Sequence, residues 1–231
     1  MTRERLTVPE QNVRDYAYEL AYKLACEQLA GIADIEEQCR NSGARYVADK
    51  KAIILDHLNK SYQIGFPKGE VSYADNEEEV PMREIILVMD YFTRAKGTPL
   101  SGKTITYKEL HDGINYFPTF SKRTIQPLVT FFGDKPEQLL KIAATMGGYK
   151  ADFGDAAVTF DTFPRVPVTY VLWKGDSEFP PEGSILFDST ISDYLTNDDI
   201  HTLCETIIWK LVRLLKTGGD TDRRHDAPEK K

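Results

Sequence analysis

Cysteine is scarce in this sequence, and the few that occur are widely separated. Cys26, Cys39 and Cys204 form no closely spaced pair. Disulfide frameworks and autonomous zinc or iron–sulfur sites need several cysteines at short, regular spacings. The sequence therefore argues against such sites, and it favours reduced thiols in a reducing compartment.

Long apolar runs and an excess of basic residues are also missing. No segment approaches the ~18 uninterrupted apolar residues of a membrane-spanning helix, and residues 1–9 hold no stretch typical of a signal peptide. The formal net charge is -7, whereas phosphate binding needs a basic surface. We expect a cytoplasmic protein with no membrane and no nucleic-acid partner.

The sequence does contain enough apolar residues for a hydrophobic core. Its 231 residues are 41% hydrophobic and 28% charged, a composition typical of one globular domain. In the first half, helical spacing of apolar residues predicts helices over Gln11–Ala30 and Met82–Arg94. Short strands are predicted between Gly and Pro turns, over 52–55, 62–64 and 70–73.

The second half begins with a predicted strand over 104–106, followed by a capping box formed by Thr106 and Glu109. Asp134 and Glu137 predict the start of another helix. A tight antiparallel pair, a third strand and a final helix ended by Gly218 follow, over 158–163, 166–173, 184–188 and 196–217. We expect a single α+β domain of small antiparallel sheets and several helices over residues 1–217, with a disordered polar tail over 218–231.

The segment from Gly97 to Thr104 matches the phosphate-binding loop pattern G-x-x-x-x-G-K-[ST]. That loop needs a strand before it and a helix after it, so that backbone amides converge on phosphate. Here a helical segment precedes the pattern, and the β-branched Ile105 and Thr106 follow it. A turn leading into a strand is favoured, and a nucleotide loop is the alternative.

Carboxylates cluster near the ends of the C-terminal strands. Asp155 and Asp176 each follow a glycine, Glu178 comes two residues later, and Asp188 ends a strand. If the strands pair, these oxygens could gather at one end of the sheet, where they would suit a divalent metal or serve as general bases. The alternative is ordinary turn chemistry, in which Asp after Gly needs no ligand.

Histidines and aromatic residues suggest a ligand of another kind. The four histidines, His57, His111, His201 and His225, show no metal-ligand spacing with one another. A tetrapyrrole needs only one axial histidine. Most of the aromatic side chains are expected in the core, and a subset could line a pocket for a flat ligand. The residues that we select for the ligand site are Asp155, Tyr170, Trp173, Asp176, Glu178, Asp188 and His201.

Several motifs, in order, resemble a known family. They lie at 100–103, 154–157, 163–167, 172–180 and 185–188. With them the chain resembles domain-of-unknown-function family three-seven-eight-six, found mainly in anaerobic bacteria and archaea. The resemblance implies no established activity, and it agrees that Leu100–Lys103 introduces a strand. Some relatives are fused to an iron–sulfur domain similar to that of corrinoid proteins, whose clustered cysteines this chain lacks.

These observations support one leading hypothesis and two alternatives. The leading one is a small-ligand-binding accessory or carrier protein of anaerobic metabolism, with a corrinoid or other tetrapyrrole as ligand and an iron–sulfur or corrinoid protein as partner. The first alternative is a metal-assisted enzyme that uses Asp155, Asp176 and Asp188. The second is a nucleotide-binding protein built on Gly102, Lys103 and Thr104.

Overall fold

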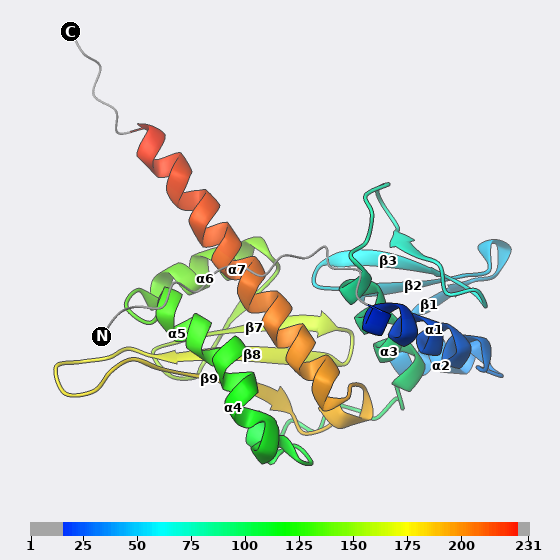
Figure 1. Cartoon of the computed structure of the whole chain (residues 1–231), viewed down its shortest axis with the longest axis horizontal. Coiled ribbons are helices and arrows are strands. Elements are labelled where there is room, and N and C mark those ends of the chain that lie inside the picture. Colours follow the sequence, from blue (N-terminus) through cyan, green and yellow to red (C-terminus); the bar gives the residue numbers. More distant parts are fainter. Residues whose placement is uncertain (1–15, 226–231) are drawn as a thin grey trace, which may run out of the picture.

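The computed structural model describes residues 16–225, which form two antiparallel sheets lying side by side along the long axis (Figure 1). The predicted start of the first helix at Gln11 and the tail residues 226–231 lie outside this range. The arrangement confirms the predicted α+β fold. None of the described helices is long and apolar enough to cross a membrane.

The first sheet is a four-stranded meander in the order β1-β2-β3-β4. Its strands are β1 (Arg45–Val47), β2 (Ala52–His57), β3 (Lys60–Gly65) and β4 (Val71–Tyr73), and its helices are α1 (Tyr16–Ala30), α2 (Ile35–Ser42) and α3 (Met82–Arg94). Helix α3 contacts both α1 and β2. Its buried side chains include Leu87, Val88 and Phe92.

The second sheet has five strands in the order β5-β9-β8-β7-β6. They are β5 (Thr104–Thr106), β6 (Tyr149–Ala151), β7 (Ala156–Phe163), β8 (Val166–Trp173) and β9 (Glu182–Asp188). The predicted hairpin of β7 and β8 is confirmed, as is the third strand beside it. The predicted capping box of Thr106 and Glu109 opens a short 3-10 helix after β5.

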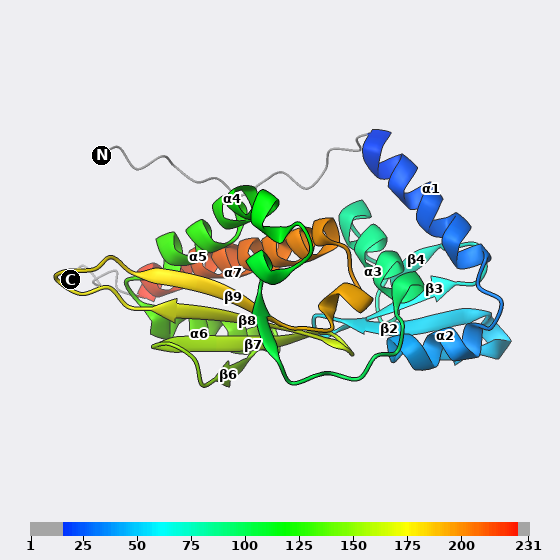
Figure 2. The same ribbon diagram turned by 90° about the horizontal axis from the view of Figure 1, so that it is seen from below.

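Four helices pack on one face of the second sheet: α4 (Gly113–Arg123), α5 (Ile125–Phe132), α6 (Pro136–Thr145) and α7 (Asn197–His225). Figure 2 shows α4, α5 and α7 above this sheet. Leu203 and Ile207 of α7 are fully buried. The predicted end of this helix at Gly218 is wrong, because α7 continues to His225. Gly218 and Gly219 each cost a helix only about 1 kcal/mol.

A buried polar cluster joins the two halves of the molecule, and we call it the Glu84 cluster. Glu84 Oε2 accepts hydrogen bonds from Tyr62 at 2.7 Å and Tyr73 at 3.4 Å, and Lys210 Nζ of α7 lies 2.7 Å from Glu84 Oε1. Burial alone would raise the pKa of Glu84, but Lys210 outweighs it and holds that pKa below its usual value. A carboxylate from α3 is thus stabilised by a cation from α7.

His57 lies beside this cluster and ties β2 to β7. Its ring stacks on Phe163 at 4.3 Å, and its Nδ1 is 2.7 Å from the carbonyl oxygen of Thr162. Burial, and then the nearby Lys210, lower the pKa of His57 to about 4. The neutral ring must therefore donate from Nδ1 to that carbonyl, because a carbonyl can only accept.

Candidate functional site

The carboxylates predicted from sequence do not form one cluster. Trp173 at the end of β8 pairs with Glu182 at the start of β9, whereas Val168 pairs with Phe187 at the other end. Asp188 therefore lies at the opposite end of the sheet from Asp176, and the expectation that all of these carboxylates gather at one end is wrong. Asp155 and Asp176 do share an end, as the antiparallel hairpin requires.

Asp155 and Asp176 are satisfied by nearby backbone amides. Asp155 Oδ2 accepts from Lys174 N at 2.8 Å. Asp176 Oδ1 accepts from the amides of Glu178 and Phe179, both at 2.8 Å, and these bonds lower the pKa of Asp176. Among the described residues no three His, Cys, Asp or Glu side chains are placed to hold a metal ion. This end of the sheet therefore shows turn chemistry and no set of metal ligands.

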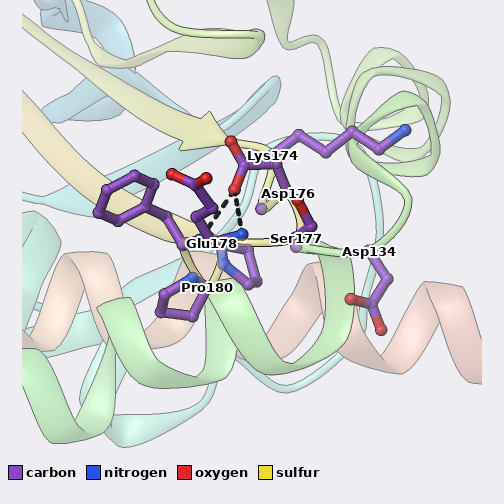
Figure 3. A pocket seen from close by; sticks show the side chains of 10 residues that line it. Asp134, Lys174, Asp176, Ser177, Glu178 and Pro180 are labelled. Atoms are coloured by element: carbon purple, nitrogen blue, oxygen red, sulfur yellow. Dashed lines mark hydrogen bonds between the residues drawn. The ribbon is translucent and has the colours of Figure 1, made fainter.

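A small hollow of about 320 Å³ lies beside the β8–β9 loop, between residues 174–181 and the α5–α6 loop at Gly133 and Asp134. Figure 3 shows the Asp176 carboxylate turned back onto its own loop by its two hydrogen bonds. Glu178 and Lys174 also line the hollow. Its lining is mostly polar and charged, unlike the apolar lining of most small-molecule pockets.

Asp188 has a structural partner: the segment that resembles a phosphate-binding loop. Its Oδ1 accepts from the amide and hydroxyl of Ser101 at 3.1 and 2.9 Å, and its Oδ2 accepts from the Gly102 amide at 2.8 Å. Burial alone would raise the pKa of Asp188, but the bonds from Thr190 and Ser101 hold it at about 2. Strand β5 follows this loop where a nucleotide loop would have a helix. The amides that could bind phosphate here bind a carboxylate of the protein.

The remaining predicted ligand residues are dispersed. Tyr170 is fully buried and donates to the Cys204 carbonyl at 3.0 Å, so it belongs to the core. Trp173 is 42% exposed at the end that carries Asp155 and Asp176. His201, on α7, is half-buried against Phe120, and burial lowers its pKa. The Nε2 atom of His201 is enclosed and has no hydrogen-bond partner within the described part of the chain.

A larger hollow of about 700 Å³ lies at the start of α7, and we call it the α7 hollow. Its volume falls within the range of about 300–1,000 Å³ that is usual for ligand pockets. It lies between the end of α3, the turn before α4 and the start of α7. Its lining residues are Arg94, Lys96, His111, Tyr116, Ser192, Asp193, Leu195, Thr196, Asn197 and Asp198.

The turn that carries His111 into this hollow has a tightly specified backbone. A Cβ at Gly113 would lie 1.9 Å from the Tyr107 carbonyl oxygen, so only glycine fits there. Asp112 has φ of +57°, in the left-handed region that few non-glycine residues adopt. The His111 carbonyl accepts from Asn197 Nδ2 at 2.7 Å. The fold thus fixes the backbone of a histidine whose side chain is 95% exposed.

The imidazole of His111 has the partner that a ligating histidine usually has. Its Nδ1 lies 3.0 Å from Asp112 Oδ2. In the neutral tautomer that carries its proton on Nδ1, the Nε2 atom keeps a free lone pair, and metal-bound histidines commonly use such a nitrogen. His111 can therefore supply one coordinating nitrogen to a ligand in the hollow.

Charged groups near His111 add to the chemistry of the hollow. Lys96 Nζ pairs with Asp193 Oδ1 at 2.8 Å, and Arg94 is exposed. One turn before Arg94, burial and the neighbouring Asp199 raise the pKa of Asp90 to about 7. Asp199 is held by Thr196, which donates to its Oδ2 from the amide at 2.9 Å and from the hydroxyl at 2.6 Å. The carboxyl group of Asp90 can thus exchange a proton near neutral pH.

The prediction from sequence missed this site, although His111 was considered. Leu110 is buried while His111 points to solvent, and a spacing argument cannot tell these neighbours apart. The available signal was the His-Asp-Gly sequence, since Asp and Gly are residues that adopt left-handed turn conformations. Such a turn can expose the side chain of the residue before it, but the sequence does not predict which residues surround that side chain.

Comparison with known proteins gives one match. The family described as "Domain of unknown function (DUF3786)" matches residues 34–210. No curated protein and no solved structure matches the chain.

Proposed function

Since this chain belongs to the DUF3786 family, which has no described function, we propose from geometry that it binds a small ligand in the α7 hollow, with His111 as the coordinating residue. The observation that carries the proposal is the pair of His111 and Asp112. Their side chains approach to 3.0 Å where the exposed imidazole lines a hollow of about 700 Å³. A surface histidine without a role would need neither the fixed backbone nor the carboxylate.

The ligand class that we propose is a corrinoid or other metal-bearing tetrapyrrole. Such a ligand needs one axial histidine, and His111 is the described histidine whose side chain is open to solvent in a hollow. Two exposed apolar side chains follow on α4, Ile114 at 71% and Tyr116 at 58%. They could pack against a flat macrocycle, while Arg94 could bind carboxylates or amides at its rim. The polar lining suits a corrinoid, whose rim carries amides, better than it suits a macrocycle whose rim carries only hydrocarbon groups.

With this ligand the protein would act as an accessory or carrier protein of anaerobic metabolism. An open hollow allows uptake and release, as a carrier requires. Transfer to an iron–sulfur or corrinoid protein is part of the same proposal. When bound, the ligand would supply the metal chemistry; this chain would bind and orient it through His111.

The test is a spectral titration of the full chain with aquocobinamide, a corrinoid that has exchangeable axial ligands. We expect a saturable shift of the visible bands at one equivalent, because an imidazole nitrogen replaces water on cobalt. His111→Ala should abolish the shift. Asp112→Asn should weaken binding by about 10- to 100-fold, the usual effect of losing such a partner.

His201→Ala is the matched control, because His201 lies outside the hollow and its Nε2 is enclosed. This variant should give the wild-type shift. No shift with wild type, or an equal loss in both histidine variants, would contradict the proposal.

A second candidate is an acid–base enzyme that uses Asp90, which lies one turn before Arg94 and does not itself line the hollow. Asp90, with a pKa of about 7, favours it, because a general acid or base works best with a pKa near the pH of the reaction. A wild-type chain that ignores the corrinoid but converts a small substrate, with activity lost in Asp90→Asn, would favour this candidate. The metal-assisted alternative at Asp155, Asp176 and Asp188 has no comparable support, since these carboxylates lie at opposite ends of the sheet.

A further inference from the structure

The second sheet has one face that the helices do not cover. Helices α4, α5 and α7 lie on one side of it, and Figure 2 shows no described helix on the other side. Core residues such as Tyr170, Leu172 and Phe160 point toward the helices. Their neighbours along each strand point the other way because side chains alternate. We call this second side the open face.

The strand register identifies the residues of the open face. Its centre holds small or hydroxylated side chains and is itself covered: Ala157 and Val171 are fully buried, and Thr159, whose hydroxyl lies 2.7 Å from that of Thr169, is 8% exposed. The exposed part of this face is therefore its margin. The full set is Thr104 and Thr106 of β5; Glu182, Ser184, Leu186 and Asp188 of β9; Pro167, Thr169, Val171 and Trp173 of β8; Ala157, Thr159 and Asp161 of β7; and Tyr149 and Ala151 of β6.

All charged side chains that the strands place on the open face are carboxylates: Asp161, Glu182 and Asp188. The strand lysine Lys150 pairs with Val158 in the register, which puts it on the helix side. Asp188 already holds the Ser101 loop. Asp161 accepts a hydroxyl from Tyr149 at 3.1 Å, and neither Asp161 nor Glu182 has a basic partner among the side chains described, those of residues 17–217.

Exposed aromatic side chains surround these carboxylates. Tyr149 is 50% exposed and Trp173 is 42% exposed. The β6–β7 turn adds Phe153, which is 44% exposed. This turn lies against the open face, because a Cβ at Gly154 would come within 2.8 Å of Val171 Cγ1. Aromatic residues are enriched at the centres of protein interfaces.

We propose that the open face is a docking surface for a protein segment that carries arginine or lysine side chains. A guanidinium can stack on Trp173 or Tyr149 and pair with Asp161 or Glu182. A nucleic acid would bring phosphates against these carboxylates. A second copy of this chain would oppose carboxylates to carboxylates, which lowers affinity. The charge of the face therefore selects a basic protein partner.

The test measures binding of a fluorescein-labelled peptide of eight alternating arginine and threonine residues to the full chain. We expect saturable polarisation that weakens as salt is raised, and no binding of the same peptide with glutamate in place of arginine. Trp173→Ala and the double variant Asp161→Asn with Glu182→Gln should each weaken binding by about tenfold. Circular dichroism checks that the variants are folded.

Asp134→Asn is the matched control, because it removes the same charge from an exposed carboxylate beside α5, on the helix side. It should change affinity by less than about twofold. An equal loss in this variant would mean general attraction to an acidic chain, and it would overturn the proposal. So would a dimer in solution that Trp173→Ala converts to monomer, since a second copy would then cover the face.

Amide resonances of the wild-type chain give a measurement that does not depend on any variant folding. Peptide-induced shifts should concentrate in β6–β9 and the β6–β7 turn. Shifts confined to the α7 hollow would overturn the proposal. The corrinoid titration tests a different surface. A failure of peptide binding therefore does not contradict the proposed ligand site, and a failure of corrinoid binding does not contradict the docking surface.

Discussion

Replacing Lys210 by methionine should destabilise the protein strongly, because it removes the cation of the Glu84 cluster. Lys210 Nζ lies 2.7 Å from Glu84 Oε1, and the two side chains are 23% and 6% exposed. In Lys210→Met the carboxylate would keep only the hydroxyls of Tyr62 and Tyr73. Breaking a buried ion pair on one side typically costs about 3–5 kcal/mol, a large share of the ~5–15 kcal/mol that stabilises most domains.

The assay is urea unfolding followed by circular dichroism. The double variant Lys210→Met with Glu84→Gln should recover most of the loss, because no buried charge remains and the amide oxygen of Gln can still accept from Tyr62. In the single variant, burial of Glu84 is no longer offset by Lys210, so the pKa of this carboxyl rises above its unfolded value. The variant should therefore lose stability as pH rises through the usual range of a carboxyl group and regain it as pH falls.

Two results would refute this reasoning: a single variant within about 1 kcal/mol of wild type, or a double variant no better than the single one. The first would mean that water or rearrangement solvates Glu84 at little cost. The second would mean that Lys210 acts mainly through the packing of its methylene chain.

Three further predictions concern stability. Asp188→Asn should cost about 1–3 kcal/mol because an amide nitrogen would face the Gly102 amide. Wild-type stability should fall from about pH 4 to pH 2, where the unfolded carboxyl is protonated and the folded one is still ionised, and this fall should flatten in the variant. An unchanged acid profile would show that Asp188 is not holding the loop. Because the folded pKa of Asp90 is raised, the wild-type chain should lose stability as pH rises from about 4 to about 7. This loss should be absent in Asp90→Asn. Equal pH slopes of the melting temperature in the two proteins would count against the pairing with Asp199. Leu203→Ala and Ile207→Ala should each cost about 2–5 kcal/mol in urea unfolding, and a cost under about 1 kcal/mol would show that α7 repacks around the cavity.

Secondary structure was predictable where the pattern was strong and local. The β-branched runs of β7 and β8 and the apolar stripe on α7 specify their elements unambiguously. Helix α2 was not predicted. Its residues are mostly polar, and the Asp34 side chain caps it by accepting from the Glu37 amide at 2.9 Å. The predicted cap at Asp134 is wrong, because α6 begins at Pro136 after Lys135.

Helices α4 and α5 were missed because Pro118 and Pro127 interrupt the signal. Their apolar side chains pack against α7 and β9, and contacts of that kind cannot be derived from local spacing. Edge strands β1 and β6 have three residues each, too few for an alternation to be read. Tertiary context supplied these elements.

The candidate site was less predictable than the fold. Asp residues at strand ends suggested a cluster, but the register of β9 separates Asp188 from Asp176. Tyr170 is buried and His111 is exposed because of the way the helices pack against the strand or turn that carries each residue. Residue type alone cannot give that information.

The Glu84 cluster also bears on synthesis of the chain by the ribosome. Tyr62, Tyr73 and Glu84 emerge early, whereas Lys210 lies midway along α7, the last helix that the structure describes. Until then, closing α3 onto the first sheet would bury a carboxylate without its cation, at a cost of several kcal/mol. The nascent amino-terminal half should therefore remain loosely closed and sensitive to protease while it is still attached to the ribosome, and the arrival of α7 should complete both halves together.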